Sequence, residues 1–391
     1  MTPSLRAIIC VCCAWLVTVQ TVVGQETVPQ ATSPHAAIAA AVEKEIQADL
    51  FPGAVVLVGT PDKVLYHEAF GFAQVKPKQV PMRKDTLFDI ASVTKVVATA
   101  TALGICKDRG LIDPDAPMTK YLPDHQGKNV DRITLRHLAS HTSGFPESPR
   151  VSFGGRYKGE ALFAQMLKFD PAWPVDTRFQ YSCRNLIYLS TIVERVTGQP
   201  FGAFCQKEIF APLEMNDSVF NRVDPSDRVA ATHHPVLGEN HNIDGRDAGC
   251  AIGNAGLFTT AGDLSNFCQM MLSGGEWRGR RILSAETIAE FTRPRHDAQF
   301  PNYSFVWETY LQSNHRPKRM SDRAFGHSGY TGISIWLDPE KQVYTIVMTN
   351  RTHPAIEGLP GGVQPKSHPR VQQQYQARGR IADAALEALG Y

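Results

Sequence analysis

Apolar and polar positions near the start of the chain predict a helix followed by two strands. Residues 35 to 50 are alanine-rich and amphipathic, as expected for a helix that buries one face. Residues 54 to 60 and 64 to 70 are short, mainly apolar runs typical of strands. Pro61 and Asp62 lie between these runs and favour a turn, so the pair predicts a β-hairpin.

The other end of the chain carries a matching pattern. Three apolar runs predict strands, and the last two are joined at Asp338-Pro339-Glu340. A loop rich in proline and glycine follows, and an amphipathic helix ends the chain. The strands are expected at 324 to 330, 331 to 337 and 342 to 349, and the helix at about 371 to 389. We therefore expect an α+β fold, in which both chain ends build an antiparallel sheet flanked by helices.

The middle of the chain carries helical patterns separated by long loops. Helices are predicted at 162 to 167, 186 to 196, 261 to 272 and 285 to 291. We expect a single domain over residues 35 to 391. Its sheet lobe would comprise about 35 to 75 and 323 to 391, and its mainly helical lobe about 76 to 322.

One stretch, ASVTKVVATATALGICKDRG, combines an unusually apolar helical pattern with candidate chemistry. A helix from about Ala91 to Arg109 places Ser92 in the first turn and Lys95 one turn later, on the same face. A serine hydroxyl becomes a good nucleophile when a nearby base takes its proton. Burial and the helix dipole both lower the pKa of a lysine, so that Lys95 can be this base. The same helix start offers backbone N–H groups to an oxyanion.

The first 24 residues resemble a secretory signal. Arg6 is the only charged residue between Met1 and Gly24, and an apolar run follows it that is short for a membrane span. We expect a cleaved signal peptide and a secreted or periplasmic protein without a stable membrane anchor.

Composition limits the classes of protein and of binding partner that fit this sequence. The chain has 391 residues, of which 43% are hydrophobic and 20% charged, enough to bury a large core. The formal net charge is only +2 and no basic stripe stands out, so nucleic acid is not an expected partner. Outside the signal, five scattered cysteines remain, with no Cys-x-x-Cys pair. They do not form a disulfide framework, although one disulfide is compatible with them.

Three further stretches hold polar residues in unusual settings. Tyr181-Ser182-Cys183 and Asn185 come just before a predicted helix. Gly326-His327-Ser328-Gly329-Tyr330 lies on a predicted strand, where glycines favour the close approach of another group. The run from His137 to Pro146 is a helix end that leads into a loop.

Together these motifs resemble the serine β-lactamase and penicillin-binding protein superfamily, in the branch of class C β-lactamases, D-aminopeptidases and carboxylesterases. Ser92-Val93-Thr94-Lys95 resembles the first motif of the family, and Tyr181-Ser182-Cys183 stands where Tyr-x-Asn belongs. His327-Ser328-Gly329 takes the place of Lys-Thr-Gly, where many relatives carry His-x-Gly. The resemblance extends from about Ile38 to Arg351 and implies a β-lactamase/transpeptidase-like fold.

The resemblance also implies roles for individual residues. Ser92 would be the acyl-accepting nucleophile, Lys95 its activating partner, and Tyr181 the phenol that relays protons. The backbone N–H groups of Ser92 and Tyr330 would form the oxyanion hole. Ser328, Gly329 and His327 would line the substrate site, with His327 hydrogen-bonding near Tyr181 or the substrate.

Two departures from the family pattern bear on the substrate. Cys183 replaces an asparagine whose amide contacts the lysine and the substrate, and a thiol cannot make both contacts. Asn185, two residues later, is a candidate substitute. His327 replaces a fixed positive charge with a group expected to titrate near neutrality. These changes favour an esterase or amidase that acts on small esters or amides without a cofactor.

Alternatives remain open at this stage. The chain could be a true β-lactamase, a D-Ala-D-Ala carboxypeptidase acting on cell-wall peptide, or a sensor that is acylated without turnover. His137 and His141 have a helical spacing suited to a metal, and further ligands could come from His125, His233, His234 or His241. They lack the glutamate of His-Glu-x-x-His, so we expect no metal. The Gly-x-Ser-x-Gly elbow of α/β-hydrolases is also absent from the sequence.

Overall fold

The computed structural model describes residues 33 to 391 except 295–298, 302, 310–314, 357–364 and 366. Within the described residues, six strands form one antiparallel sheet in the order β3-β2-β1-β11-β10-β9. Their bounds are β1 Gly53–Gly59, β2 Val64–Gln74, β3 Val80–Pro81, β9 Phe325–Ser328, β10 Ile333–Asp338 and β11 Val343–Thr349. The predicted α+β fold with a sheet made from both chain ends is therefore confirmed.

The two chain ends meet in the centre of this sheet. β1 pairs with β11 from Ala54 opposite Thr349 to Gly59 opposite Tyr344. Both strands are buried along their whole length, which explains why apolar residues dominate both of them.

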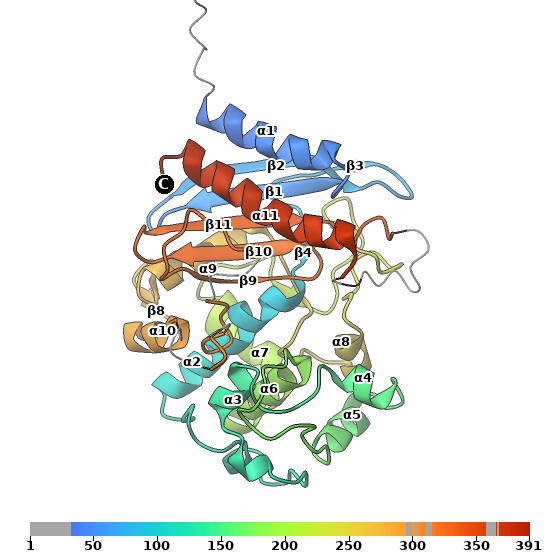
Figure 1. Ribbon diagram of the computed structural model, residues 1–391, viewed down its shortest axis with the longest axis vertical. Helices are drawn as coiled ribbons and strands as arrows, with labels where there is room; N and C mark the ends of the chain where they lie inside the picture. The colour runs from blue at the N-terminus through green and yellow to red at the C-terminus, as the bar shows by residue number, and fades with distance from the viewer. Residues whose placement is uncertain (1–32, 295–298, 302, 310–314, 357–364, 366) are drawn as a thin grey trace, which may run out of the picture. The chain divides into compact units, whose positions relative to one another are not determined.

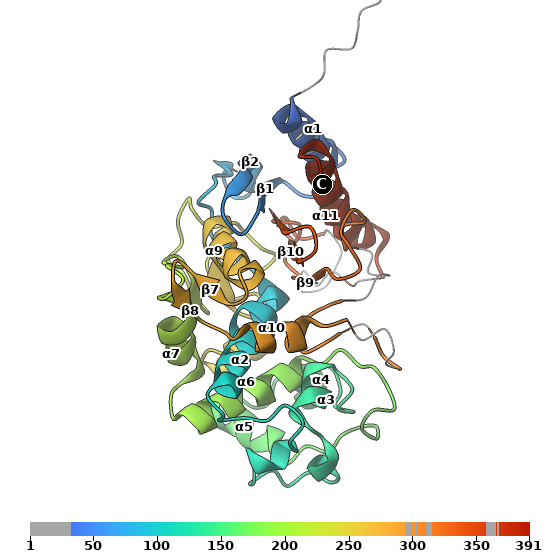
Figure 2. The same ribbon diagram turned by 90° about the vertical axis from the view of Figure 1, so that its left-hand side faces the viewer.

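Helices cover both faces of the sheet. α1 (Pro34–Gln47) and α11 (Pro369–Ala388) pack against each other and lie over one face, as Figure 1 shows. α9 (Ala261–Leu272) lies on the opposite side (Figure 2) and contacts β1, β10 and β11. The placement of α9 corrects our lobe assignment, because this helix falls within the predicted helical lobe yet packs on the sheet.

The rest of the middle segment is built from short elements joined by loops. Its helices are α2 Thr101–Asp108, α3 Leu135–Ala139, α4 Pro149–Phe153, α5 Gly159–Met166, α6 Cys183–Thr197, α7 Phe201–Cys205, α8 Ile243–Ala248 and α10 Ala285–Thr292. Its strands are β4 Phe88–Asp89, β5 Val219–Phe220, β6 Leu257–Thr259, β7 Glu276–Trp277 and β8 Arg280–Arg281. One hydrophobic core runs from β1 through α2 and α6 to α5, so the lobes share their interior.

The predicted helix from Ala91 to Arg109 is present, but its geometry changes along its length. A 3₁₀ turn spans Ala91–Val93, a π-helical stretch spans Lys95–Ala100, and α2 completes the segment. All residues from Val93 to Cys106 are buried, so the segment is a central element of the core. Wide π-helical turns are rare in proteins, and those that occur are often found at functional sites.

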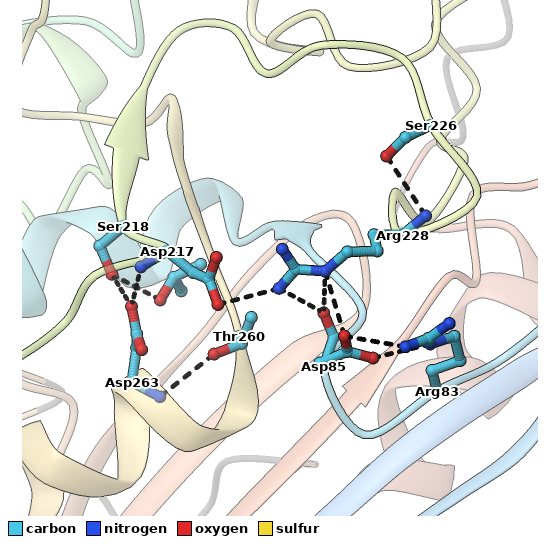
Figure 3. Close-up of polar contacts among 9 residues, drawn as sticks. Arg83, Asp85, Asp217, Ser218, Ser226, Arg228, Thr260 and Asp263 are labelled. Carbon is cyan, nitrogen blue, oxygen red and sulfur yellow. Dashed lines mark hydrogen bonds and ion pairs between the residues drawn. The ribbon is translucent and has the colours of Figure 1, made fainter.

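A polar network that runs from the surface to buried Ser218 and Asp263 connects α9 with the loop before β4 (Figure 3). Arg228 donates to the backbone carbonyl of Asp85 at 3.2 Å and to the Asp217 carboxylate at 2.9 Å. The Asp263 carboxylate on α9 accepts from the Asp217 N–H and the Ser218 hydroxyl, both at 2.9 Å. The network fixes the loop that leads into β4 and then into the Ser92 segment.

Three further expectations concern the signal peptide, a membrane span and the cysteines. The predicted signal peptide, Met1 to Gly24, lies outside the described residues. Within the described part, no helix is both long and apolar enough to cross a bilayer. The five cysteines there are all free thiols, so none forms the single disulfide that the sequence left open.

Candidate active site

Ser92 and Lys95 lie side by side at the start of the buried helical segment. The 3₁₀ turn carries Ser92, and Lys95 opens the π-helical stretch. The Nζ atom of Lys95 lies 3.0 Å from the Oγ atom of Ser92. It also donates a 2.6 Å hydrogen bond to the backbone carbonyl of Asn254, an acceptor that the sequence did not reveal. The two side chains therefore have the geometry of a nucleophile and its base.

The surroundings of Lys95 favour its neutral form. Its side chain is completely buried, and this burial lowers the pKa of the Lys95 ammonium. Interactions with Cys183 and, more weakly, with Asp244 act in the opposite direction. Because burial is the largest effect, Lys95 is suited to accept a proton from Ser92.

Tyr181 reaches the same point from the loop before α6. Its ring centre lies 5.2 Å from Lys95 Nζ, and the ring packs on His141 with 4.5 Å between centroids. The Nδ1 atom of His141 accepts a 3.1 Å hydrogen bond from the N–H of Ser182. The buried His141 ring therefore supports the loop and the Tyr181 side chain that it carries.

His327 is neutral and buried on β9. Its Nδ1–H donates to the backbone carbonyl of Ser328 at 2.9 Å, which leaves Nε2 as the acceptor nitrogen. Burial, aided by the charge of Lys95, lowers the pKa of His327 to about 3. Our expectation that His327 titrates near neutrality is therefore wrong, because the sequence does not show that the ring is shielded from water.

The turn between β9 and β10 approaches the Ser92 segment very closely. A Cβ atom added to Gly329 would lie 2.4 Å from the carbonyl oxygen of Ile90, so only glycine fits there. Arg378 of α11 donates to the carbonyl oxygens of Gly329 and Ile333, at 3.0 and 2.6 Å, and supports the turn from behind. Tyr330 follows Gly329 directly and is thereby held beside Ser92.

A cavity of about 580 Å³ opens over these groups. Its wall includes most of the residues predicted from the motifs, namely Ser92, Tyr181, Cys183, His327, Ser328 and Tyr330. Its far side comes from α4, α8 and the loops beside them. The volume suits a small-molecule substrate.

The amino-acid sequence matches the family model described as Beta-lactamase over residues 38–360. The chain belongs to the beta-lactamase family. Members of this family are serine hydrolases that act on esters or amides, and so is this protein. The matched range agrees closely with the resemblance expected from the motifs.

Known members with different activities resemble this chain along most of its length. The N-acetylmuramyl-L-alanine amidase of Bacillus subtilis (strain 168) is 25% identical, and the match covers 94% of this chain and 92% of the amidase. A penicillin-binding protein homologue from Caulobacter crescentus has a TM-score of 0.69 and 22% identity, over 91% of this chain and 98% of its own. A family VIII carboxylesterase has a TM-score of 0.67 and 22% identity, over 91% of this chain and 98% of its own. These two structures show the shared fold.

The two residues considered for the missing family asparagine have different positions. Cys183 lines the cavity and interacts with Lys95. Asn185 is buried below the cavity wall, where its amide donates to the Leu138 carbonyl at 3.0 Å and accepts from the Ser143 hydroxyl at 2.8 Å. Asn185 therefore does not substitute for the missing family asparagine, which corrects our expectation. Its side chain instead joins α6 to α3.

The histidines of the metal alternative serve other purposes. His137 pairs with Thr134 in a capping box at the start of α3, and His141 binds the Ser182 N–H. His125 contacts the Tyr188 hydroxyl at 3.1 Å. Among the described residues, no group of three or more His, Cys, Asp or Glu side chains is arranged to hold a metal ion.

Sequence reasoning missed several residues of this beta-lactamase-family site. Asn254 binds Lys95, and Asp244 and Tyr303 line the cavity. His241, considered from the sequence only as a possible metal ligand, also lines it. These residues lie in loops or short elements that carry no periodic pattern. The only sequence signal is the run of small and polar residues from Gly249 to Asn254, and that signal does not point to a contact with Lys95.

Proposed function

We propose that this protein cleaves esters or small amides through an acyl-enzyme formed on Ser92. The observation that carries this proposal is the 3.0 Å contact between Ser92 Oγ and the fully buried Nζ of Lys95, whose pKa is lowered by that burial. A neutral amine at hydrogen-bond distance from a serine hydroxyl is the arrangement needed to activate the nucleophile.

In the proposed reaction, Lys95 takes the hydroxyl proton as Ser92 Oγ attacks the substrate carbonyl carbon. The resulting oxyanion faces the backbone N–H groups of Ser92 and Tyr330. Tyr181 gives its proton to the leaving alcohol or amine and regains one from Lys95, so that the first product departs neutral. In the second half, the same groups take a proton from water, the hydroxide attacks the acyl carbon, and Ser92 leaves as the alcohol.

The chemistry of the cavity wall favours neutral substrates. His327 carries no charge in the neutral pH range, and Cys183 offers only a weak donor where the family has an amide. The site therefore lacks two groups that would pair with the carboxylate and the side-chain amide of a β-lactam. The carboxylesterase and the amidase among its relatives are compatible with the preference for esters and amides.

Two further parts of this proposal concern the location of the enzyme and its turnover. The first 24 residues support export, so we place the enzyme outside the cytoplasm, where cell-wall peptides are a second class of available substrate. Cys183 beside Lys95 also raises the alternative of an acylated sensor that does not turn over, and a measurement of product release separates the two.

The test combines intact-protein mass spectrometry with turnover assays. Wild-type protein and the Ser92→Ala variant are mixed with 4-nitrophenyl acetate, 4-nitrophenyl butyrate, benzylpenicillin and a chromogenic cephalosporin. We expect an acyl adduct and multiple turnovers with the esters, slower reaction with both β-lactams, and neither adduct nor turnover for Ser92→Ala. Ser273→Ala, at the exposed end of α9, serves as the matched control and should behave as wild type. Substantial turnover by Ser92→Ala would refute the acyl-enzyme, and a stable adduct without product release would identify a sensor.

A further inference from the structure

A buried carboxylate lies three residues before the nucleophile. Asp89 ends β4 and its side chain has no exposed surface. Its Oδ1 atom accepts a 2.9 Å hydrogen bond from the backbone N–H of Ala91. Its Oδ2 atom accepts a 2.9 Å hydrogen bond from the backbone N–H of His241 and lies 2.7 Å from the ring Nδ1 of the same residue. A buried charge is tolerated only when it is paired and hydrogen-bonded. These three donors meet that need, and they require that Nδ1 of His241 carries a hydrogen.

The first of these contacts acts on the backbone at Ser92. Ala91 has a φ of 48°, in the left-handed region that residues with a side chain avoid. Such a conformation persists only where the surroundings enforce it. The Asp89 side chain, bonded to the N–H two residues further on, holds this bend and so directs Ser92 into the first helical turn.

Asp89 is also bonded to the opposite half of the site. Its backbone carbonyl accepts a 2.6 Å hydrogen bond from the Thr331 hydroxyl, in the turn that carries Tyr330. The His241 ring, fixed by the carboxylate, stacks on the Tyr330 ring with 5.5 Å between centroids and 15° between planes. Asp89 therefore holds both Ala91 and the turn that carries Tyr330. Its partner His241 lies 152 positions away in the sequence.

We infer that Asp89 and His241 are positioning residues that hold the Tyr330 backbone N–H at a fixed place relative to Ser92. This inference rests on the proposed function, because it assigns the pair to the oxyanion hole of that reaction. Neither side chain needs to touch the reacting atoms. The pair acts through Ala91 on one side and through Tyr330 and Thr331 on the other.

Two variants of His241 separate its two contacts. His241→Phe keeps a flat ring against Tyr330 but removes the donor to Asp89. His241→Asn loses the ring but places an amide N–H close to the former Nδ1. Because the hydrogen bond to the carboxylate is charge-assisted, it is the stronger contact and its loss should matter more. Thr331→Val keeps the shape of residue 331 and removes only the bond to the Asp89 carbonyl.

The measurements are kcat and KM for 4-nitrophenyl acetate and the inhibition constant of phenylboronic acid, which forms a tetrahedral adduct on a serine. Removal of an oxyanion donor lowers kcat about 10²- to 10³-fold, so a displaced donor in His241→Phe should lower it by about 10-fold or more. Boronate affinity should fall in parallel while KM stays within about twofold. His241→Asn should recover at least part of kcat, and Thr331→Val should lower kcat about threefold. His234→Phe, in the same loop but outside the cavity wall, is the matched control and should equal wild type.

The outcomes distinguish this inference from the proposed function. If Ser92→Ala is inactive while His241→Phe and Thr331→Val keep wild-type kcat and boronate affinity, the positioning role is wrong and the acyl-enzyme stands. If His241→Phe fails to fold, Thr331→Val decides, and unchanged kcat in that variant overturns the inference. Equal losses in His241→Phe and His241→Asn with unchanged boronate affinity would also overturn it. Activity that survives in Ser92→Ala refutes the proposed function itself.

Discussion

The close approach of Gly329 to the Ser92 segment can be tested with a single methyl group. In Gly329→Ala the new Cβ would lie 2.4 Å from the Ile90 carbonyl oxygen, whereas real Cβ atoms keep at least 3.0 Å from other heavy atoms. The β9–β10 turn and the Ser92 segment must therefore separate by 3.0 minus 2.4, or at least about 0.6 Å. Both contacting groups are backbone, so neither can turn aside as a side chain would.

The size of the effect follows from this displacement. A shift of about 1 Å in a catalytic arrangement can reduce the rate about 10²-fold, so we expect a loss of about 10- to 10²-fold in kcat. Insertion of a methyl group into a packed interior costs about 1–3 kcal/mol. For a chain of this length each kcal/mol lowers Tm by about 2 °C, which predicts a fall in Tm of about 2–6 °C.

The assay compares Gly329→Ala with Gly262→Ala, using ester hydrolysis for kcat and thermal unfolding for Tm. Gly262 lies in α9, where a Cβ would meet only Thr260 Oγ1 at an ordinary 3.8 Å. That control should keep wild-type kcat and unfold at the same or a higher temperature, because alanine favours a helix over glycine. Wild-type kcat and Tm in Gly329→Ala would show that the two segments separate freely, and the reasoning about the turn would fail.

Three more predictions address the proton-carrying groups and the substrate. Tyr181→Phe should lower kcat for esters about 10²-fold with little change in Tm, because it removes only a general acid–base hydroxyl; lowered Tm with full activity would make Tyr181 a packing residue instead. Burial lowers the pKa of Lys95 in the folded state, so below the usual 10.5 the unfolded chain binds more protons and stability rises with pH. The free energy of unfolding of wild type relative to Lys95→Met, measured in urea from pH 7 to 10, should therefore increase with pH, and a flat or falling difference would contradict a lowered pKa. Cys183→Asn combined with His327→Lys should raise the kcat/KM ratio of cephalosporin over ester, since each restored polar contact is worth about 1–3 kcal/mol; an unmoved ratio would remove these two residues from the substrate argument.

Local patterns were sufficient to predict the covering helices and every strand of the sheet except β3, which has only two residues. β1 and β11 are central strands with long apolar runs, and α9 was predicted with its observed bounds from helical periodicity. The Ser92 and Lys95 contact followed from their spacing alone, because residues three apart share a helix face. The same rule could have excluded Asn185. A residue two positions after Cys183 on α6 is turned by about 200° and faces the opposite side.

Tertiary contacts explain what the sequence could not reveal. The acceptor for Lys95 is a loop carbonyl at Asn254, 159 positions later, and no side-chain pattern marks it. The π-helical stretch after Ser92 has the same apolar pattern as an ordinary helix. The protonation of His327 depends on the β9 backbone and on the distance to Lys95, both of which require the folded structure. Whether a histidine is charged is therefore a property of its burial and not of its residue type.

The protonation states of Lys95, His141 and His327 are linked, and this linkage bears on the proposed preference for neutral substrates. Burial is the first cause of the lowered pKa of Lys95, of His141 and of His327, and the charge of Lys95 lowers the pKa of both histidines further. A proton on any one of these three groups opposes a proton on the others, so together the three groups disfavour holding more than one proton at a time. In the proposed reaction that proton is the one taken from Ser92, which appears on Lys95 as the oxyanion forms. A lysine in the place of His327 would instead add a permanent charge beside Lys95 before any substrate arrives, which helps to bind a carboxylate and makes Lys95 a weaker base. The neutral His327 gives up that binding energy, but it leaves Lys95 without a second permanent charge beside it and so keeps Lys95 a stronger base.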